Sequence, residues 1–251
     1  TTQGTVPLST TLDSVGSLGR SVACCWAADS LMATGGIALA DAPTGRDGGT
    51  PKLGILNTLV LDGLDDTVAR TWQSSLRALA AKGVLLEEFA CPPVADIAPA
   101  NAKGGFTAAE SLAWHLPLLG AHEQHYDPFV LRRILRGYEQ SATDYIALLA
   151  ARARLIRQAR NIMEHYDAVI LPTVPIVAPT IDSLADDAHY AATNLLLLRN
   201  TAIANFLDLC AISLPIHTPG DAPVGLMLMG RNGGDAALFH LAARIERLLS
   251  T

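Results

Sequence analysis

The chain has 251 residues, of which 50% are hydrophobic, and a formal net charge of −6 from 18 Lys and Arg against 24 Asp and Glu. A chain of this length buries a sizeable core, and its scattered basic residues exclude a concentrated surface for nucleic acid or anionic membrane. No apolar run is long enough to cross a bilayer, and the first residues lack the order of a signal peptide, so we expect neither membrane insertion nor export.

The first half of the chain alternates between helical and strand patterns. We expect a helix over 18–33 that stops at Gly35-Gly36, a polar loop over 41–51, and a strand over 54–61. The next helix has its apolar stripe at Val68, Trp72, Leu76 and Leu79, and a strand over 84–89 follows it. A strand, a helix and a strand in this order is the unit that builds parallel sheet.

The second half is expected to be helical first and mixed afterwards. Predicted helices cover 107–119, 127–137, 143–166, 195–206 and 235–249, and predicted strands cover 167–175, 210–215 and 224–230. Asp186-Asp187 is interpreted as a solvated turn. The pattern predicts an α/β fold in which helices flank a mixed β-sheet.

Local motifs give few candidates for catalysis or metal binding. The sequence has no G-x-S-x-G, H-E-x-x-H, Walker loop or paired CxxC. His122 and His125 stand three apart without a third ligand, so no metal is expected, and His115 is expected to be half-buried and hydrogen-bonded.

The four cysteines are expected in a reducing, cytoplasmic setting. Adjacent Cys24 and Cys25 form neither an unstrained disulfide with each other nor an ordinary metal-ligand spacing. Both are interpreted as small buried residues in the middle of a helix. The alternative, a cysteine hydrolase, requires an exposed thiol of low pKa.

Small polar groups beside the ends of predicted strands are more informative. Thr173 stands between Pro172 and Pro175, and residues 205–213 precede Pro215. Loops at strand ends in α/β sheets present hydroxyl and backbone groups to ligands. Because these prolines fit equally well a purely structural role in ending strands, the local pattern leaves both interpretations open.

Six segments in a fixed order carry a more specific signal. They are P-L-S-T-T-L-D-S-V-G-S-L-G-R-S-V at 7–22, E-S-L-A-W-H at 110–115, the stretch from Y-D-P to A-A-R at 126–152, D-A-V-I-L-P-T-V-P-I-V-A-P at 167–179, the stretch from R-N-T to S-L-P at 199–215, and the stretch from P-V-G-L-M-L-M-G to G-D-A-A-L at 223–238. In this order they resemble the amidase signature family over nearly the whole chain.

The resemblance implies hydrolysis of a carboxylic amide, with a small-molecule amide as the expected substrate, or transfer of an amide nitrogen, in either case without metal or organic cofactor. Family members use a Ser, cis-Ser, Lys triad in which a neutral lysine acts as the base. Both serines, their G-G-S-S loop and the lysine lie upstream of the family position that Gly4 matches, and none is found in this sequence. Ser74-Ser75 lies in a predicted helix without flanking glycines, and Lys52 lacks the family's lysine motif.

We therefore expect residues 1–251 to be the C-terminal part of a single amidase-signature-like domain. It would contain no catalytic residue, would be inactive alone, and would have the missing N-terminal segment as its partner. A homodimer is left open, and no nucleic acid or membrane partner is expected. The alternative is a noncatalytic or amidotransferase-type subunit of the same fold.

Three positions are implied by the family's motifs to face the substrate: Thr173, Asn205 and Asp208. Family members commonly have glycine where Asp208 stands, so this acid is expected to face the pocket and contribute to substrate choice. Asp13 is expected instead to tie a turn by hydrogen bonding to nearby N–H groups.

Overall fold

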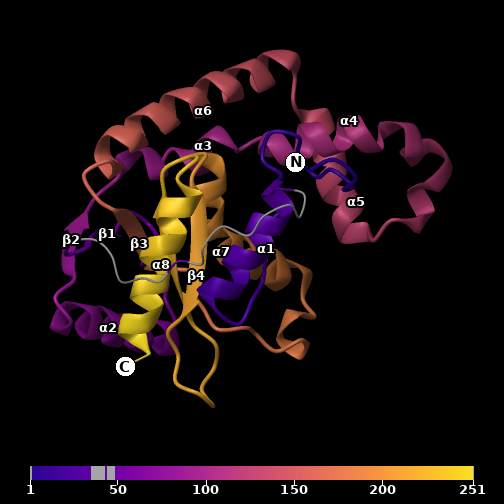
Figure 1. Cartoon of the computed structure of the whole chain (residues 1–251). Coiled ribbons are helices and arrows are strands. Elements are labelled where there is room, and N and C mark those ends of the chain that lie inside the picture. Colours follow the sequence, from indigo (N-terminus) through magenta and orange to yellow (C-terminus); the bar gives the residue numbers. More distant parts are fainter. Residues whose placement is uncertain (1, 35–42, 44–48, 251) are drawn as a thin grey trace. The chain divides into compact units, whose positions relative to one another are not determined.

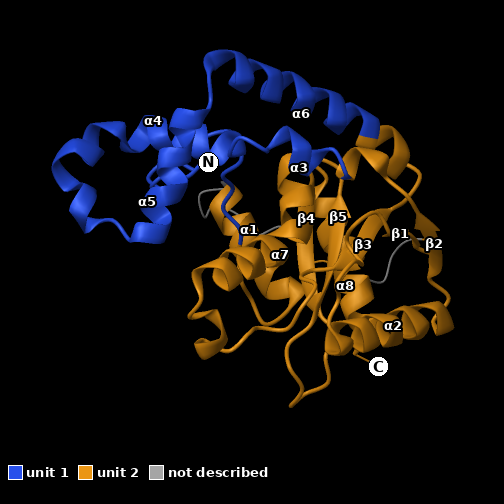
Figure 2. Ribbon diagram, turned by 180° about the vertical axis from the view of Figure 1, so that it is seen from behind, with its two compact units in different colours: residues 1–16, 95–158 blue, residues 17–94, 159–251 orange. Residues whose placement is uncertain are grey.

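The computed structural model describes residues 2–34, 43 and 49–250 (Figure 1). They divide into two compact units, one formed by Thr1–Gly16 and Ala95–Gln158 and the other by Ser17–Val94 and Ala159–Thr251 (Figure 2). We call these the first and the second unit and describe each by itself. A single domain over 1–251 stays a prediction. The predicted stop at Gly35-Gly36 and most of the predicted loop over 41–51 lie outside the described residues.

A mixed five-stranded sheet forms the centre of the second unit, which confirms the predicted fold class. Its strands are β1 (Lys52–Leu56), β2 (Leu85–Phe89), β3 (Ala168–Pro172), β4 (Cys210–Pro215) and β5 (Gly225–Gly230), in the spatial order β2-β1-β3-β5-β4. β1 pairs in parallel with β2 and β3, whereas β5 pairs antiparallel with β3 and β4. The predicted parallel unit is confirmed, with α2 (Asp66–Ala81) connecting β1 to β2.

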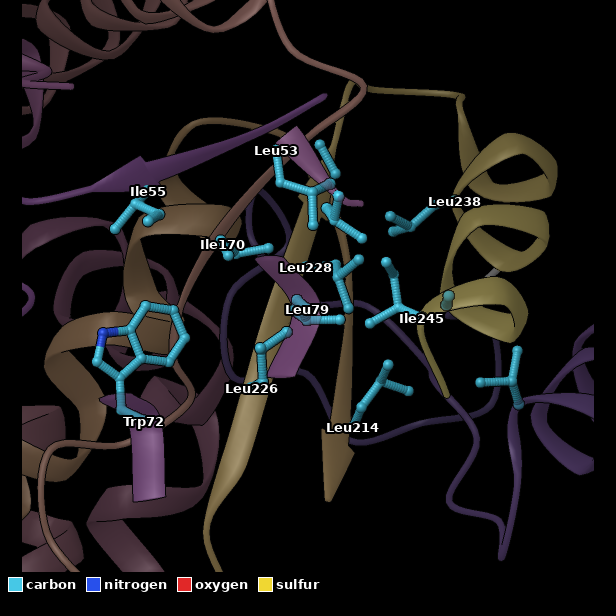
Figure 3. Close-up of a cluster of buried hydrophobic side chains, with 14 residues drawn as sticks. Leu53, Ile55, Trp72, Leu79, Ile170, Leu214, Leu226, Leu228, Leu238 and Ile245 are labelled. Atoms are coloured by element: carbon cyan, nitrogen blue, oxygen red, sulfur yellow. The ribbon is translucent and has the colours of Figure 1, made fainter. Parts of the chain in front are cut away.

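The main core of the second unit lies on one face of this sheet. Alternate residues of the strands, including Leu53, Ile170, Leu228 and Leu214, point to the same side because successive side chains of a strand alternate, and Leu86 of the edge strand β2 packs against them. Three helices cover them: α1 (Val22–Thr34), α2 and α8 (Asp235–Leu249); Figure 3 shows Trp72 and Leu79 of α2 and, on α8, Leu238 and Ile245. The last long helix, α7 (Asp187–Phe206), lies on the other side of the sheet from α8 (Figures 1 and 2).

The apolar stripe predicted for α2 is confirmed. Val68, Trp72 and Leu79 are at most 1% exposed, and Leu76 is partly buried against the same core. The helix begins after Asp65, whose carboxylate accepts a hydrogen bond from the Val68 N–H and so satisfies a donor that the first turn leaves unpaired.

The first unit is helical. It contains α3 (Ile97–Ala100), α4 (Gly105–His122), α5 (Pro128–Leu135) and α6 (Ala142–Met163) up to Gln158, with 3₁₀ turns at Glu123–His125 and Arg136–Glu139. Leu112, Leu119 and Ile134 form a small core between α4 and α5. Gly137 lets the 3₁₀ turn after α5 approach α4, since a Cβ there would lie 2.5 Å from the Ala108 carbonyl oxygen.

Two predicted helix starts were misplaced. The first helix begins at Val22, not at residue 18, and α7 begins at Asp187, not at residue 195. Asp186 is the N-cap of α7 and accepts from the His189 N–H, so the predicted solvated turn is the start of a helix. None of the helices in the described part of the chain combines the length and apolarity needed to span a bilayer.

Candidate functional site

Thr173 directly follows β3 and is held by two neighbouring strands. Its N–H donates to the Gly225 carbonyl oxygen at 2.8 Å, and its hydroxyl lies 2.6 Å from the hydroxyl of Ser213 on β4. A Cβ at Gly225 would lie 2.5 Å from the Ser213 oxygen and 2.6 Å from the Thr173 oxygen, so the pair can meet only because this residue is glycine. The sheet thus presents two adjacent hydroxyl groups where β3 and β4 end.

A buried asparagine on α7 holds the carbonyl that precedes Thr173. Asn200 is 0% exposed, and its amide nitrogen donates to the Pro172 oxygen at 2.8 Å and to the Val60 oxygen at 3.2 Å. Arg199 donates to the side-chain oxygen of Asn200 at 3.0 Å. Since an arginine nitrogen can only donate, this contact fixes which end of the amide faces the Pro172 carbonyl.

Asn205 and Asp208 lie together at the other end of β4. Asn205 is in the last turn of α7, and its carbonyl oxygen accepts from the Asp208 N–H at 3.4 Å. Asp208 has a φ of 59°, in the left-handed region that favours glycine, and its carboxylate accepts from the side chain of Asn232. Asp208 lies two residues before Cys210, where β4 starts, and Thr173 contacts Ser213 three residues further along that strand, a span of about 10 Å along β4.

The lysine and serines considered from the sequence have structural roles. Lys52 pairs with Glu87 at 2.8 Å, and this hydrogen bond raises the pKa of the lysine, which keeps it protonated and unsuited to act as a base. The Ser75 hydroxyl is buried and donates to the Trp72 carbonyl, and Ser74 is exposed on α2.

The cysteine and histidine predictions had mixed outcomes. Cys24 is exposed in the first turn of α1, so the prediction of a buried mid-helix residue was wrong; α1 begins too late to bury it. All four cysteines are free thiols. His115 is half-buried and lies 2.7 Å from the Tyr126 hydroxyl, as predicted. No group of three potential metal ligands occurs among the residues that the structure describes.

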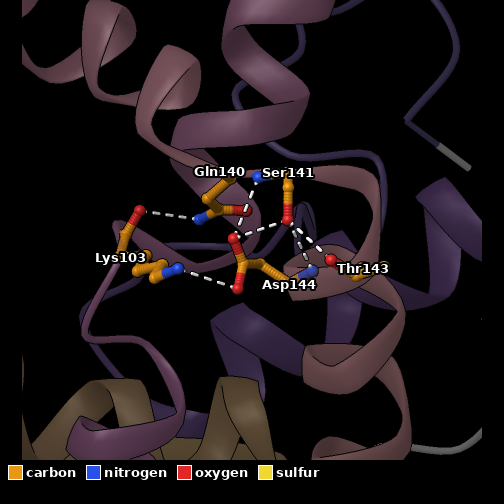
Figure 4. Close-up of polar contacts among 5 residues, drawn as sticks. All are labelled: Lys103, Gln140, Ser141, Thr143 and Asp144. Carbon is orange, nitrogen blue, oxygen red and sulfur yellow. Dashed lines mark hydrogen bonds and ion pairs between the residues drawn. The ribbon is translucent and has the colours of Figure 1, made fainter.

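Polar clusters in the first unit organise its segments. The predicted role of Asp13 is confirmed, since its carboxylate accepts from the Leu8 and Ser9 N–H groups at 2.9 and 3.0 Å. At the start of α6, Asp144 accepts from Lys103 and Ser141 (Figure 4). The hydrogen bond from Lys103 and those from Ser141 lower the pKa of Asp144 to about 2.

The sequence suggested Thr173 as a candidate but not the residues that hold it. Ser213 and Asn200 lie within motif-bearing segments, but their contacts with the β3 loop depend on strand pairing and helix packing. Asn200 stands within the apolar pattern of 195–206. Because a buried amide needs a hydrogen-bond partner, this position was the one signal in the sequence for such a contact.

Comparison with known proteins places the fold and the family. The chain is 30% identical over 253 residues to 2-amino-5-chloromuconic acid deaminase of Comamonas testosteroni, covering 98% of this chain and 54% of that protein. It is 27% identical to a glutamyl-tRNA(Gln) amidotransferase subunit of Sulfurisphaera tokodaii, covering 79% of this chain and 46% of that protein. A crystal structure of an amidase superposes with a TM-score of 0.77 at 23% identity, over 97% of this chain and 55% of that one.

The matches cover nearly all of this chain but only part of each relative. The chain spans about half the length of these relatives. The family model described as Amidase matches residues 1–239, which is nearly the whole chain. This chain belongs to the amidase family.

Proposed function

We propose that this chain is the C-terminal portion of an amidase that hydrolyses a carboxylic amide through a Ser, cis-Ser, Lys triad outside this sequence. Family membership supports the reaction class. The sequence supports the location of the triad, because its one Ser-Ser pair, Ser74-Ser75, lies inside a helix. Among its three lysines, Lys52 and Lys103 are ion-paired and Lys82 caps the end of α2.

The contribution of this chain would be the wall of the pocket for the acyl group. The triad serine would form a bond to the amide carbonyl carbon, the amine would leave with a proton, and water would release the acyl group from the serine. The observation that carries the proposal is the hydroxyl pair of Thr173 and Ser213, which the sheet holds at the ends of β3 and β4. Loops at the carboxyl ends of strands are common ligand sites in α/β sheets.

Asn205 and Asp208 are proposed as further substrate contacts on motif position alone. Since they lie at the other end of β4 from Thr173, they would contact a different part of the substrate. A substrate that reaches both places would have a long acyl group, because β4 spans about 10 Å from Cys210 to Ser213.

The test is release of ammonia from a panel of amides with short, aromatic and long acyl groups. We expect no activity from the chain alone and activity when it is combined with the complementary upstream portion. Thr173→Val, which removes the hydroxyl at nearly constant volume, should lower kcat/KM by about fivefold to tenfold for substrates with a polar group near the carbonyl. Hydrolysis by the chain alone would contradict the proposed location of the triad.

A second candidate is a noncatalytic or amidotransferase-type subunit of the same fold. The similarity to an amidotransferase subunit favours it. The net charge of −6 gives no support to contact with RNA. Release of ammonia from glutamine, with other amides left intact, would favour the amidotransferase-type subunit. Inactivity of the combined protein towards every amide would favour the noncatalytic one.

A further inference from the structure

The loop that carries Thr173, residues 173–177, is held at its far end by a residue of another segment. The Asp65 carboxylate accepts from the Val177 N–H at 2.6 Å, and the Asp65 N–H donates to the Pro175 carbonyl oxygen at 3.1 Å. Asp65 is far from this loop in sequence, directly before α2. We call residues 173–177 the Thr173 loop.

Asp65 has a second task at the same time. Its other carboxylate oxygen accepts from the Val68 N–H at 2.7 Å, which caps α2. The helix is anchored in the main core by Trp72 and Leu79. One carboxylate therefore links the Thr173 loop to a helix that the core holds in place.

The near end of the loop is fixed by different groups. Asn200 holds the Pro172 carbonyl, Gly225 accepts from the Thr173 N–H, and Ser213 holds the Thr173 hydroxyl. With Asp65 at the far end, both ends of a loop of five residues are bound to rigid elements. Such a loop has lost its conformational entropy before a ligand arrives, which is how a preformed site gains selectivity.

We propose that Asp65 is a positioning residue that fixes the Thr173 loop and so sets which acyl groups the site accepts. It acts through the backbone of Val177 and Pro175 and contacts no substrate itself. This inference rests on the proposed function, since it assumes that Thr173 faces the acyl group.

A serine at position 65 separates the two tasks of Asp65. Its single oxygen can still cap α2 through the Val68 N–H, but it is too short to bind the Val177 N–H as well. Asp186→Ser is the matched control, because Asp186 caps α7 by accepting from the His189 N–H. The two variants change the same residue type at the same kind of position.

Hydrogen exchange tests the clamp on the 251-residue chain and on the chain combined with its upstream portion. We expect Asp65→Ser to speed exchange of the Val177 amide by about tenfold or more, and Asp186→Ser to leave that amide unchanged. Both variants should lower the melting temperature, and Asp65→Ser should lower it more, because it also loses the hydrogen bond from the Val177 N–H. Unchanged exchange at Val177 in Asp65→Ser would overturn the clamp.

Activity of the combined protein tests positioning. The ratio of kcat/KM values for a short and a long acyl amide should change at least threefold in Asp65→Ser and stay constant in Asp186→Ser. Asp65→Asn keeps one acceptor oxygen, so its change in this ratio should be smaller than that of Asp65→Ser. Faster exchange with an unchanged ratio would reject the positioning role and leave the proposed function standing. If the wild-type combination hydrolyses no amide, the proposed function and the selectivity claim fail together, whereas the exchange result still decides the clamp.

Discussion

Glu110 on α4 accepts hydrogen bonds from several segments of the first unit, and its replacement by glutamine should lower the stability of the fold. The carboxylate accepts from the Ser9 hydroxyl at 2.5 Å, the Thr11 N–H at 3.0 Å and the Tyr145 hydroxyl at 2.6 Å, and also from the Thr11 hydroxyl. Glutamine offers one acceptor oxygen in place of two and carries no charge. All four donors then lose a charged acceptor, and two of them face an NH₂ group in place of an oxygen; hydrogen bonds to charged groups are worth about 1.5–3 kcal/mol against 0.5–1.5 for neutral ones.

We expect Glu110→Gln to lower the free energy of unfolding by about 2–4 kcal/mol at pH 7. For a chain of this size that corresponds to a fall in melting temperature of roughly 5–15 °C. Urea denaturation followed by circular dichroism measures the difference. Glu123→Gln is the control, because Glu123 is exposed beyond the end of α4.

The effect of Glu110→Gln on the free energy of unfolding should also depend on pH. Burial raises the pKa of Glu110, but hydrogen bonds from Ser9, Thr11 and Tyr145 outweigh it and hold the pKa below the ordinary value of 4.5. The stability from this carboxylate is therefore fully present above pH 4.5 and is lost as the pH falls through the lowered folded-state pKa. Since glutamine does not titrate, the gap between wild type and variant should close in acid. Equal stability at pH 7, or a gap that stays constant down to pH 2, would refute the reasoning.

Two further predictions concern the hydroxyl pair and the thiols. Gly225→Ala should lower the free energy of unfolding, measured by urea denaturation, by about 1–3 kcal/mol, because the new methyl group would overlap the oxygens of Ser213 and Thr173. Adding Ser213→Ala should recover part of this loss. A single variant as stable as the wild type would show that the two hydroxyl groups are not sterically confined. A thiol reagent at pH 8 should modify exposed Cys24 in the folded chain and spare Cys91, whose burial raises its pKa to about 11; labelling of Cys91 before unfolding would contradict the packing around it.

Helices and strands with a strong apolar pattern and clear start or stop residues could be predicted closely from the sequence. β4 and α8 have the bounds expected for them, since a Pro ends the one and an acidic first turn starts the other. The start of α7 could not be predicted, because residues 187–194 have little apolar periodicity and an Asp-Asp pair is typical of both turns and N-caps. The cap bond from His189 distinguishes the two, and only coordinates show it.

The sequence could suggest Thr173 as a candidate, but not its contacts. A polar residue after a buried strand indicated Thr173, whereas Ser213, Asn200 and Asp65, which hold Thr173 and its loop, come from three other segments. The contact of Thr173 with Ser213 depends on the antiparallel pairing of β5 with both β3 and β4, which the local pattern does not contain. The same pairing separates Thr173 from Asp208, two residues that the motifs alone suggested for one pocket.

The place of residues 95–158 in the chain has a consequence for biosynthesis. These residues, which belong to the first unit, come between β2 and β3 of the second. Leu53 on β1 must pair with Ala168 on β3, and the Lys52 N–H with the Asp167 carboxylate, across 115 residues. Such distant contacts slow folding, because the chain must close a long loop before they form. On the ribosome, β1 and β2 emerge before β3 and wait with one edge of β1 unpaired until residues 95–158 have been synthesised, a period in which the nascent sheet is open to association with other chains.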